Sequence, residues 1–188
     1  MLRKLLAAAA LIASLLAPAS AFPLTTDQAA SLAADAGFPG MVQVDEDATA
    51  PNGHYGKVLG MIPAILLDQP AGFPDRWMAV ILYHEIGHYL QDAAGILGSM
   101  SPREREWDAD VIGAMLGCDH GLTIGDVLDL QAWAYRASGG YDDGVHGNFN
   151  DRSLNVIRRA GAYCEKHQSP WSNLVRGLKR ALTFGRYA

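Results

Sequence analysis

The sequence has few basic residues and, beyond its first 21 positions, no long apolar run. It carries 15 Lys and Arg against 20 Asp and Glu in 188 residues, a net charge of −5. Because nucleic-acid-binding surfaces are strongly basic, this balance argues against a nucleic-acid partner. The main later apolar stretch, 58–67, contains Pro63 and is shorter than the roughly 20 residues of a membrane-spanning helix. We therefore expect no membrane span in the mature protein.

Cysteine is also scarce. The two cysteines are Cys118 and Cys164, and the absence of a C-x-x-C pair argues against a cysteine-based zinc site. In an oxidising compartment two cysteines favour a single disulfide, which would tie two helices together. Two buried free thiols are the alternative interpretation.

The N-terminal segment has the pattern of a secretory signal peptide. Arg3 and Lys4 precede an apolar core over 5–17, and the small residues at 19–21 form a cleavage site. We expect cleavage after Ala21 and a periplasmic or secreted product. Residues 22–188 would then form one domain, because this length is sufficient for a single hydrophobic core.

Residues 84–88 read His-Glu-Ile-Gly-His, a pattern typical of zinc peptidases. Positions i and i+4 of a helix lie on one face, so His84 and His88 can bind the same ion. Glu85 lies about 100° further round the turn, where its carboxylate can reach water at the ion without being a ligand. The motif therefore predicts a zinc site with its own general base. A solvated helix carrying two unrelated histidines is the alternative.

The flanking residues predict a buried helix over 76–94, with Asp75 as its N-cap and Gly95 as its stop. Apolar residues cover most of its surface, which is typical of a helix inside a domain. Two His and a Glu are costly to bury unpaired, and a metal ion removes that cost. Gly87 indicates either the close approach of a strand or substrate, or mere tolerance of glycine at this position.

A second helix follows. Residues 101–104 form a capping box with proline at the first helical position, which predicts a helix to about Leu116 with Gly117 as C-cap. Glu106 and Asp110 lie four residues apart and share a face of this helix. Glu106 is the candidate third zinc ligand, and Asp110 the candidate acceptor for the outer N–H of a ligand histidine.

Two other acidic residues of this helix compete for the ligand role. Glu104 suits the helix cap better, and Asp108 points away from the face shared by Glu106 and Asp110. An acidic, exposed helix start without any metal is the remaining alternative.

Together these residues resemble the gluzincin metallopeptidases. The motif at 84–88 and the Glu-x-x-Ala-Asp-x-x-Gly run from Glu106 are similar to the group that contains the CAAX prenyl proteases and the heat-shock membrane peptidases. That group has a His-x5-Arg motif after its third ligand, which His146 and Arg152 match, although Gly147 stands where proline is usual. The gap from His88 to Glu106 is short for that group and closer to thermolysin-like or ImmA-type gluzincins.

The resemblance implies a zinc-dependent peptidase acting on a peptide or protein substrate. Zinc would be held by His84, His88 and Glu106, with Asp110 positioning a ligand. Glu85 would accept the proton of the attacking water and pass it to the leaving amine.

Strands are predicted at 41–44 and 57–68, and Pro63 makes the second either an edge strand or the site of a bulge. Residues 50–54 read as a turn with an exposed His54. In zincins an edge strand above the metal holds the substrate backbone, and part of 54–68 is a candidate for that role. A short hairpin that only covers the core is the alternative.

Two further helices are predicted, from Thr123 to about Ala137 and from Asp151 to about His167. The loop 138–150 between them holds His146 and Tyr141, either of which could stabilise an oxyanion. A plain surface loop is the alternative, and its Asp and Asn residues also allow a calcium site. A last amphipathic helix is predicted from Ser169; its basic face meets solvent, an acidic partner or a membrane surface.

The predicted architecture is α+β, a mainly helical zincin-like domain with a small β-sheet. The predicted function is an exported zinc peptidase. One alternative is a catalytically restrained or inactive zinc-binding or chaperone-like protein of the same fold in the cell envelope, with His146 blocking the open position of the zinc. Another is a structural envelope protein with a coincidental motif. The sequence predicts neither the substrate's identity nor the oligomeric state.

Overall fold

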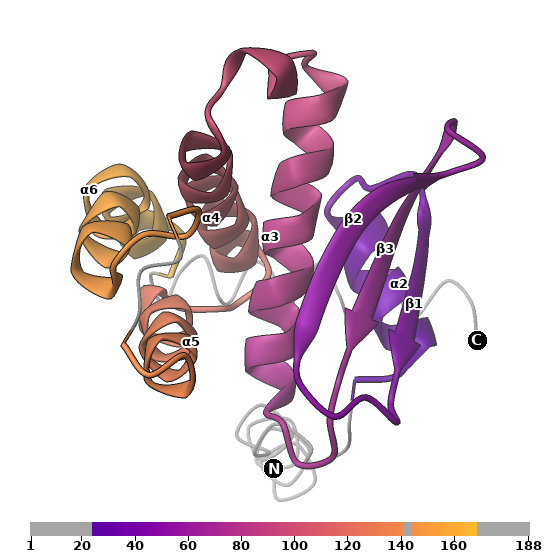
Figure 1. The fold of residues 1–188 in the computed structure, drawn as a ribbon, viewed down its shortest axis with the longest axis horizontal. Coiled ribbons are helices and arrows are strands. Elements are labelled where there is room, and N and C mark those ends of the chain that lie inside the picture. Colours follow the sequence, from indigo (N-terminus) through magenta and orange to yellow (C-terminus); the bar gives the residue numbers. More distant parts are fainter. Residues whose placement is uncertain (1–23, 141–143, 169–188) are drawn as a thin grey trace, which may run out of the picture.

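Helices dominate the chain, and a small sheet lies at one side of them (Figure 1). The computed structural model describes residues 24–140 and 144–168. The elements are α2 (Thr26–Asp35), β1 (Met41–Asp45), β2 (Asn52–Val58), β3 (Ile62–Asp68), α3 (Asp75–Ala93), η1 (Leu97–Ser99), α4 (Pro102–Asp119), α5 (Ile124–Ala137) and α6 (Phe149–His167). The predicted α+β class, mainly helical with a small sheet, is confirmed for this part of the chain.

The sheet has the strand order β1-β3-β2, with β1 parallel and β2 antiparallel to β3. The predicted single edge strand over 57–68 is wrong. Leu59 and Gly60 form a tight turn between two strands, and the strand with Pro63 lies in the centre. Proline is tolerated there because pairing with β1 begins only at the next residue, Ala64.

The edge strand beside α3 is β2, which the sequence did not predict over its full length. The predicted turn over 50–54 is wrong in part, because β2 already begins at Asn52. His54 is exposed, as expected. The strand reads Asn-Gly-His-Tyr-Gly-Lys-Val, so it lacks the alternating apolar residues by which strands are recognised.

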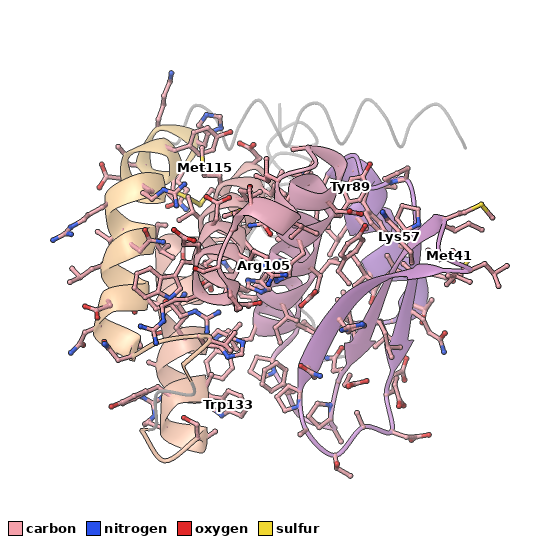
Figure 2. All side chains as sticks on the ribbon, turned by 45° about the horizontal axis from the view of Figure 1, so that its top comes forward. Met41, Lys57, Tyr89, Arg105, Met115 and Trp133 are labelled. Carbon is pink, nitrogen blue, oxygen red and sulfur yellow. A yellow bond between two sulfur atoms is a disulfide. The ribbon has the colours of Figure 1, made fainter. Side chains whose placement is uncertain are left out.

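One face of the sheet packs against α2 and α3. Its buried residues alternate along the strands, as a half-buried sheet requires, and they are Val42, Val44, Ile65 and Leu67. Met41 belongs to the opposite face and points away from the helices (Figure 2). The main core therefore lies between this sheet and the helical layer.

The helix with the His-Glu-Ile-Gly-His motif, α3, runs through the middle of the molecule (Figure 1). Its predicted length is close to that observed, but its N-cap is Pro74 and not Asp75. Asp75 is the first helical residue, and its carboxylate accepts a hydrogen bond of 3.0 Å from the Gln69 side chain. Nearly half of α3 is buried, which confirms the prediction of an interior helix.

The remaining helices begin at side-chain caps. Ser101 and Glu104 form the predicted capping box of α4, and α4 continues past the predicted stop at Gly117 to Asp119. A second capping box starts α5, as predicted. The predicted cap of α6 is wrong: Asn148 accepts the hydrogen bond from the Asp151 amide, which places the helix start three residues earlier.

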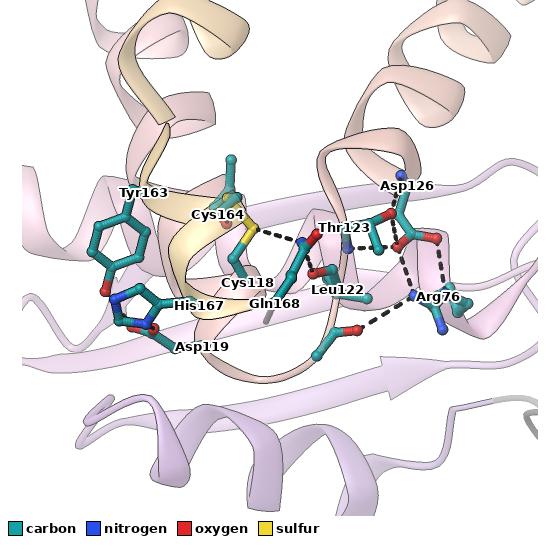
Figure 3. Close-up of a disulfide and its surroundings, with 12 residues drawn as sticks. Arg76, Cys118, Asp119, Leu122, Thr123, Asp126, Tyr163, Cys164, His167 and Gln168 are labelled. Carbon is teal, nitrogen blue, oxygen red and sulfur yellow. Dashed lines mark hydrogen bonds and ion pairs between the residues drawn. A yellow bond between two sulfur atoms is a disulfide. The ribbon is translucent and has the colours of Figure 1, made fainter. Parts of the chain in front are cut away.

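Cys118 at the end of α4 and Cys164 near the end of α6 are joined by a disulfide (Figure 3). Both cysteines are fully buried. The Gln168 side chain reinforces the same junction, since its amide donates a 2.8 Å hydrogen bond to the Leu122 carbonyl. The bridge therefore fixes α6 against α4, the helix that carries Glu106.

Replacing both cysteines by alanine is expected to lower the free energy of unfolding by about 2–4 kcal/mol. The disulfide between Cys118 and Cys164 restricts the conformations of the unfolded chain, and removing the disulfide increases the entropy of the unfolded state. Chemical denaturation followed by circular dichroism measures the change, with the reduced wild type as control. Two reactive thiols in the unfolded, unreduced wild type would contradict the bridge.

Some predicted features lie outside the described residues. They are the signal peptide at 1–21, Tyr141 with its two neighbouring aspartates, and the helix predicted from Ser169. Within the described ranges, no helix is both long and apolar enough to cross a membrane.

Candidate metal centre

Three side chains from two helices converge on one point. His84 and His88 come from α3 and Glu106 from α4, and one ligand atom of each lies within 4.8 Å of the other two. Nε2 of His84 is 3.2 Å from Oε2 of Glu106, and Nε2 of His88 is 3.4 Å from Oε1. Two imidazole nitrogens and a carboxylate therefore face one another, as the sequence predicted.

This arrangement fits a tetrahedral cation. Ligand atoms about 2.0–2.1 Å from zinc lie about 3.3 Å from one another, close to both measured separations. Two histidines and one carboxylate form a donor set that catalytic zinc sites use, and it leaves a fourth position open. The three side chains are between 15% and 18% exposed, so the point between them is accessible from solvent.

Two glycines bring the two helices together. A Cβ on Gly87 would lie 2.8 Å from the Ala109 carbonyl oxygen, and a Cβ on Gly113 would lie 2.8 Å from the His84 amide nitrogen. Backbone therefore packs on backbone where α3 crosses α4, which sets Glu106 against the histidines. The space beside Gly87 is occupied by α4. A strand or substrate, which the sequence suggested for this position, does not lie there.

Asp110 lies beside His84, one helical turn beyond Glu106. Its carboxylate is 2.9 Å from Nδ1 of His84 and accepts a 3.1 Å hydrogen bond from Gln131. Arg152 of α6 binds both carboxylate oxygens, one of them through its NH2 group at 2.8 Å. Nδ1 of His84 is thereby engaged, which leaves Nε2 for a metal.

The charges of this cluster perturb one another. Burial disfavours the protonated form of His84, but hydrogen bonds to Asp110 and Glu106 outweigh it and raise the pKa to about 10. Burial acts to raise the pKa of Glu106 and of Asp110; the histidines, with Arg152 for Asp110, outweigh it and hold both pKa values well below their usual range. Because a ligand imidazole must be neutral, a cation that bound here would displace a proton.

His88 has its own orienting partner, which the sequence reasoning missed. Nδ1 of His88 is 3.1 Å from the side-chain oxygen of Gln91, and the Gln91 amide donates a 2.8 Å hydrogen bond to the Arg105 carbonyl. Gln91 is 1% exposed. A buried polar residue three positions after His88 on an apolar helix is the signal that identifies it.

Glu85 is buried between α3 and the edge strand. Its Oε2 accepts a 2.8 Å hydrogen bond from the Tyr55 backbone amide. A Cβ on Gly53 would lie 2.8 Å from its Oε1 and 2.5 Å from Ile81. The sequence did not identify Gly53 or Tyr55 as functional, because the turn-like composition of 50–54 concealed the strand.

His146 approaches the cluster from the loop before α6. Its Nε2 is 3.6 Å from Oε2 of Glu106, and its side chain is 49% exposed. The Trp107 indole donates a 2.8 Å hydrogen bond to the His146 carbonyl, and Gly147 packs against the same ring. The loop is thus anchored to α4 next to Glu106.

The rival acidic residues are engaged elsewhere. Glu104 completes the capping box with Ser101. Asp108 forms an ion pair of 2.6 Å with Arg159 of α6. In the described part of the chain, the His84, His88 and Glu106 cluster is the one group with metal-ligand spacing. The calcium alternative includes Asp142 and Asp143, which lie outside the described residues.

The cluster lies in a cleft of about 590 Å³, a volume typical of ligand sites. β2 forms one wall, α3 the floor, and α4, α5 and the His146 loop the other wall. The lining includes Gly53, Tyr55, Ile81, Glu85, Arg105, Leu130, Trp133, His146 and Arg152, besides the three candidate ligands. All residues predicted for the site that fall within the described ranges therefore meet in one place.

Comparison with the models of known protein families, with curated proteins and with solved structures finds no match to this chain.

Proposed function

We propose that this protein is an exported zinc-dependent peptidase with a zincin-like domain of the gluzincin type. The observation that carries the proposal is the convergence of His84, His88 and Glu106 in an open cleft, with the Glu85 carboxylate beside them. Separate helices supply these groups, so the arrangement is more specific than the sequence motif alone. The predicted signal peptide supports export.

The His-x5-Arg motif formed by His146 and Arg152 supports the resemblance to the CAAX protease and heat-shock peptidase group. His146 and Arg152 reach the same cluster from one loop and one helix start. Arg152 neutralises Asp110, and His146 approaches Glu106 at the mouth of the site. A coincidental motif in a structural protein gives no reason for these two residues to meet Glu106 and Asp110.

In the proposed mechanism His84, His88 and Glu106 would hold a zinc ion, which when bound would supply Lewis-acid chemistry toward water and the substrate carbonyl. Glu85 acts as general base, accepts the proton of the attacking water and donates it to the leaving amine. Asp110 and Gln91 hold the two imidazoles in the tautomer that presents Nε2. His146 donates a hydrogen bond to the developing oxyanion.

The outer edge of β2 is the proposed support for the substrate backbone. The Tyr55 amide points away from β3, toward Glu85. Backbone groups alternate in direction along an antiparallel strand, so those of Gly53 share this orientation. A peptide added to this edge would pass over the ligands, which supports β2 as the strand with the role expected for part of 54–68.

Gly53→Ala is expected to lower peptide hydrolysis by about 10- to 100-fold, because the new methyl group must displace the Glu85 carboxylate or the strand. Metal binding should not change, since the nearest contacts of the new methyl group are Ile81 and Glu85, neither of which is a candidate ligand. Gly56→Ala is the matched control on the same strand, where a Cβ has its nearest contact at an ordinary 3.5 Å. Equal loss in both variants would contradict the proposed role of Gly53.

An alternative function is favoured by the position of His146, 3.6 Å from Glu106. If its imidazole occupies the open position of the metal, the protein is a restrained or inactive zinc-binding protein of the same fold. Higher activity in His146→Ala would favour this alternative. Lower activity would favour oxyanion stabilisation.

A digest of an unbiased peptide library tests the proposal. We expect new peptide termini in the presence of the protein, none after treatment with a chelator, and recovery when zinc is returned. The Glu85→Gln variant serves as a control for contaminating proteases. Cleavage that persists in both the chelated sample and the variant would contradict the proposal.

A further inference from the structure

Arg105 precedes the candidate ligand Glu106 on α4 and lines the same cleft. His88, Leu97 and Pro102 also line this cleft, and the Arg105 carbonyl accepts a hydrogen bond from Gln91. Figure 2 shows Arg105 in the middle of the molecule, between the sheet and the C-terminal helices. A guanidinium group is therefore present in the cleft that would hold the proposed scissile bond.

The Arg105 side chain has no partner in the described part of the chain. Its Nε is buried without a hydrogen bond, and no ion pair or ring contact engages the guanidinium. Other arginines of the region are engaged: Arg103 lies over the Trp107 ring, and Arg159 pairs with Asp108. Because an unpaired, partly buried guanidinium is costly, the position indicates a partner that arrives with the substrate.

The cleft also has an apolar part, to which Val127, Leu130, Trp133 and Ala134 contribute. Trp133 lines it and packs against Trp77, while the Arg105 carbonyl binds Gln91. At 1.5 Å per residue, Trp77 and Gln91 lie roughly 21 Å apart along α3. Arg105 and Trp133 therefore lie well apart among the residues that line the cleft, and they differ in chemistry (Figure 2).

The direction of the edge strand relates these two residues to the substrate. β2 runs in the same sense as α3: Gly53 lies against Ile81 near its first half, and Lys57 pairs with Asp92 near its end. An antiparallel peptide, the more stable pairing, runs in the opposite sense. Its N-terminal part lies toward Arg105 and its C-terminal part toward Trp133.

We propose that Arg105 determines specificity by binding a carboxylate on a substrate residue N-terminal to the scissile bond. The substrate class is then a peptide with Asp or Glu before that bond and a bulky apolar residue after it. Planar, bidentate pairing with the guanidinium favours a carboxylate over an amide of the same shape. This inference rests on the proposed peptidase function.

Matched peptides test it, with Glu or Gln at each of the three positions before the cleaved bond. We expect the zinc-loaded wild type to prefer one Glu peptide by about 10-fold in kcat/KM, mainly through KM. Arg105→Gln should reduce this ratio to about one while retaining zinc and the cleavage of the Gln peptides. Arg105→Glu should favour a Lys peptide instead. Arg103→Gln is the control and should keep the wild-type preference.

The same comparison is made for binding, by fluorescence anisotropy of labelled peptides with zinc-loaded Glu85→Gln protein and its Arg105→Gln double variant. Binding separates the two proposals. Acid-selective binding that depends on Arg105 supports the inference even where no peptide is cleaved, a result that would overturn the peptidase function alone. Cleavage without acid preference, or a preference unchanged in Arg105→Gln, overturns the role of Arg105.

Discussion

Replacing Glu85 by glutamine is expected to lower kcat/KM for peptide hydrolysis by about 10²–10⁴-fold, the contribution of a positioned general base. The amide oxygen of glutamine can still accept the Tyr55 amide hydrogen bond, so the edge strand keeps its position. None of the three candidate ligands is altered. The assay is hydrolysis of a peptide found in the library digest.

Metal content and melting temperature are the controls for this variant, and both should equal those of the wild type. A variant that keeps zinc and loses hydrolysis assigns chemistry to the carboxylate. Hydrolysis within a few-fold of wild type would remove Glu85 from the mechanism, and loss of zinc would instead indicate that Glu85 supports the metal.

The second large effect concerns the metal itself. Glu106→Gln is expected to weaken zinc binding by at least about 100-fold, because losing a ligand costs more than the 10- to 100-fold loss of a group that only orients one. The neutral amide is a poor zinc ligand beside two imidazoles. Competition titration with a coloured zinc chelator measures the affinity.

Glu104→Gln is the matched control on the same helix. Gln serves as well as Glu at the third position of a capping box, so helix α4 and its zinc affinity should be preserved. If both variants bind zinc as tightly as wild type, Glu106 is not a ligand. If both lose zinc equally, the effect lies in the helix and not in the carboxylate.

Much of the site could be predicted because its groups lie on helices. The spacing of His84 and His88 fixes their shared face, and the spacing of Glu106 and Asp110 does the same for α4. The contact between the two helices is a tertiary interaction, which Gly87 and Gly113 permit. The sequence alone does not indicate which residue each glycine contacts.

The groups that escaped prediction belong to the edge strand and to side-chain networks. Gly53 and Tyr55 lie on a strand with hardly any apolar alternation, so its register depends on β3 and α3 and not on local sequence. The contacts of Gly53 and Tyr55 with Glu85 could therefore not be predicted from the sequence. Likewise, Arg105 reads from the sequence as an ordinary residue of an exposed helix start.

The prediction that the strand with Pro63 lies at a sheet edge was wrong for a related reason. Pro63 predicts an edge when a whole strand is assumed to pair on both sides, but here pairing with β1 starts at Ala64. The helix starts were easier, since Ser101 and Thr123 each combine with an acidic residue three positions later. At the start of α6, both Asn148 and Asp151 are suitable N-cap residues. Asn148 is the observed cap, and the loop just before it is held by the hydrogen bond from Trp107 to the His146 carbonyl.

The metal site is tested most directly by the metal content of the purified, zinc-equilibrated chain after extensive dialysis, measured by elemental analysis. We expect one zinc ion per wild-type chain and almost none in a His84→Ala, His88→Ala double variant that retains its circular dichroism spectrum. A wild-type chain that holds no zinc, or a double variant that holds as much as wild type, would contradict the proposed site.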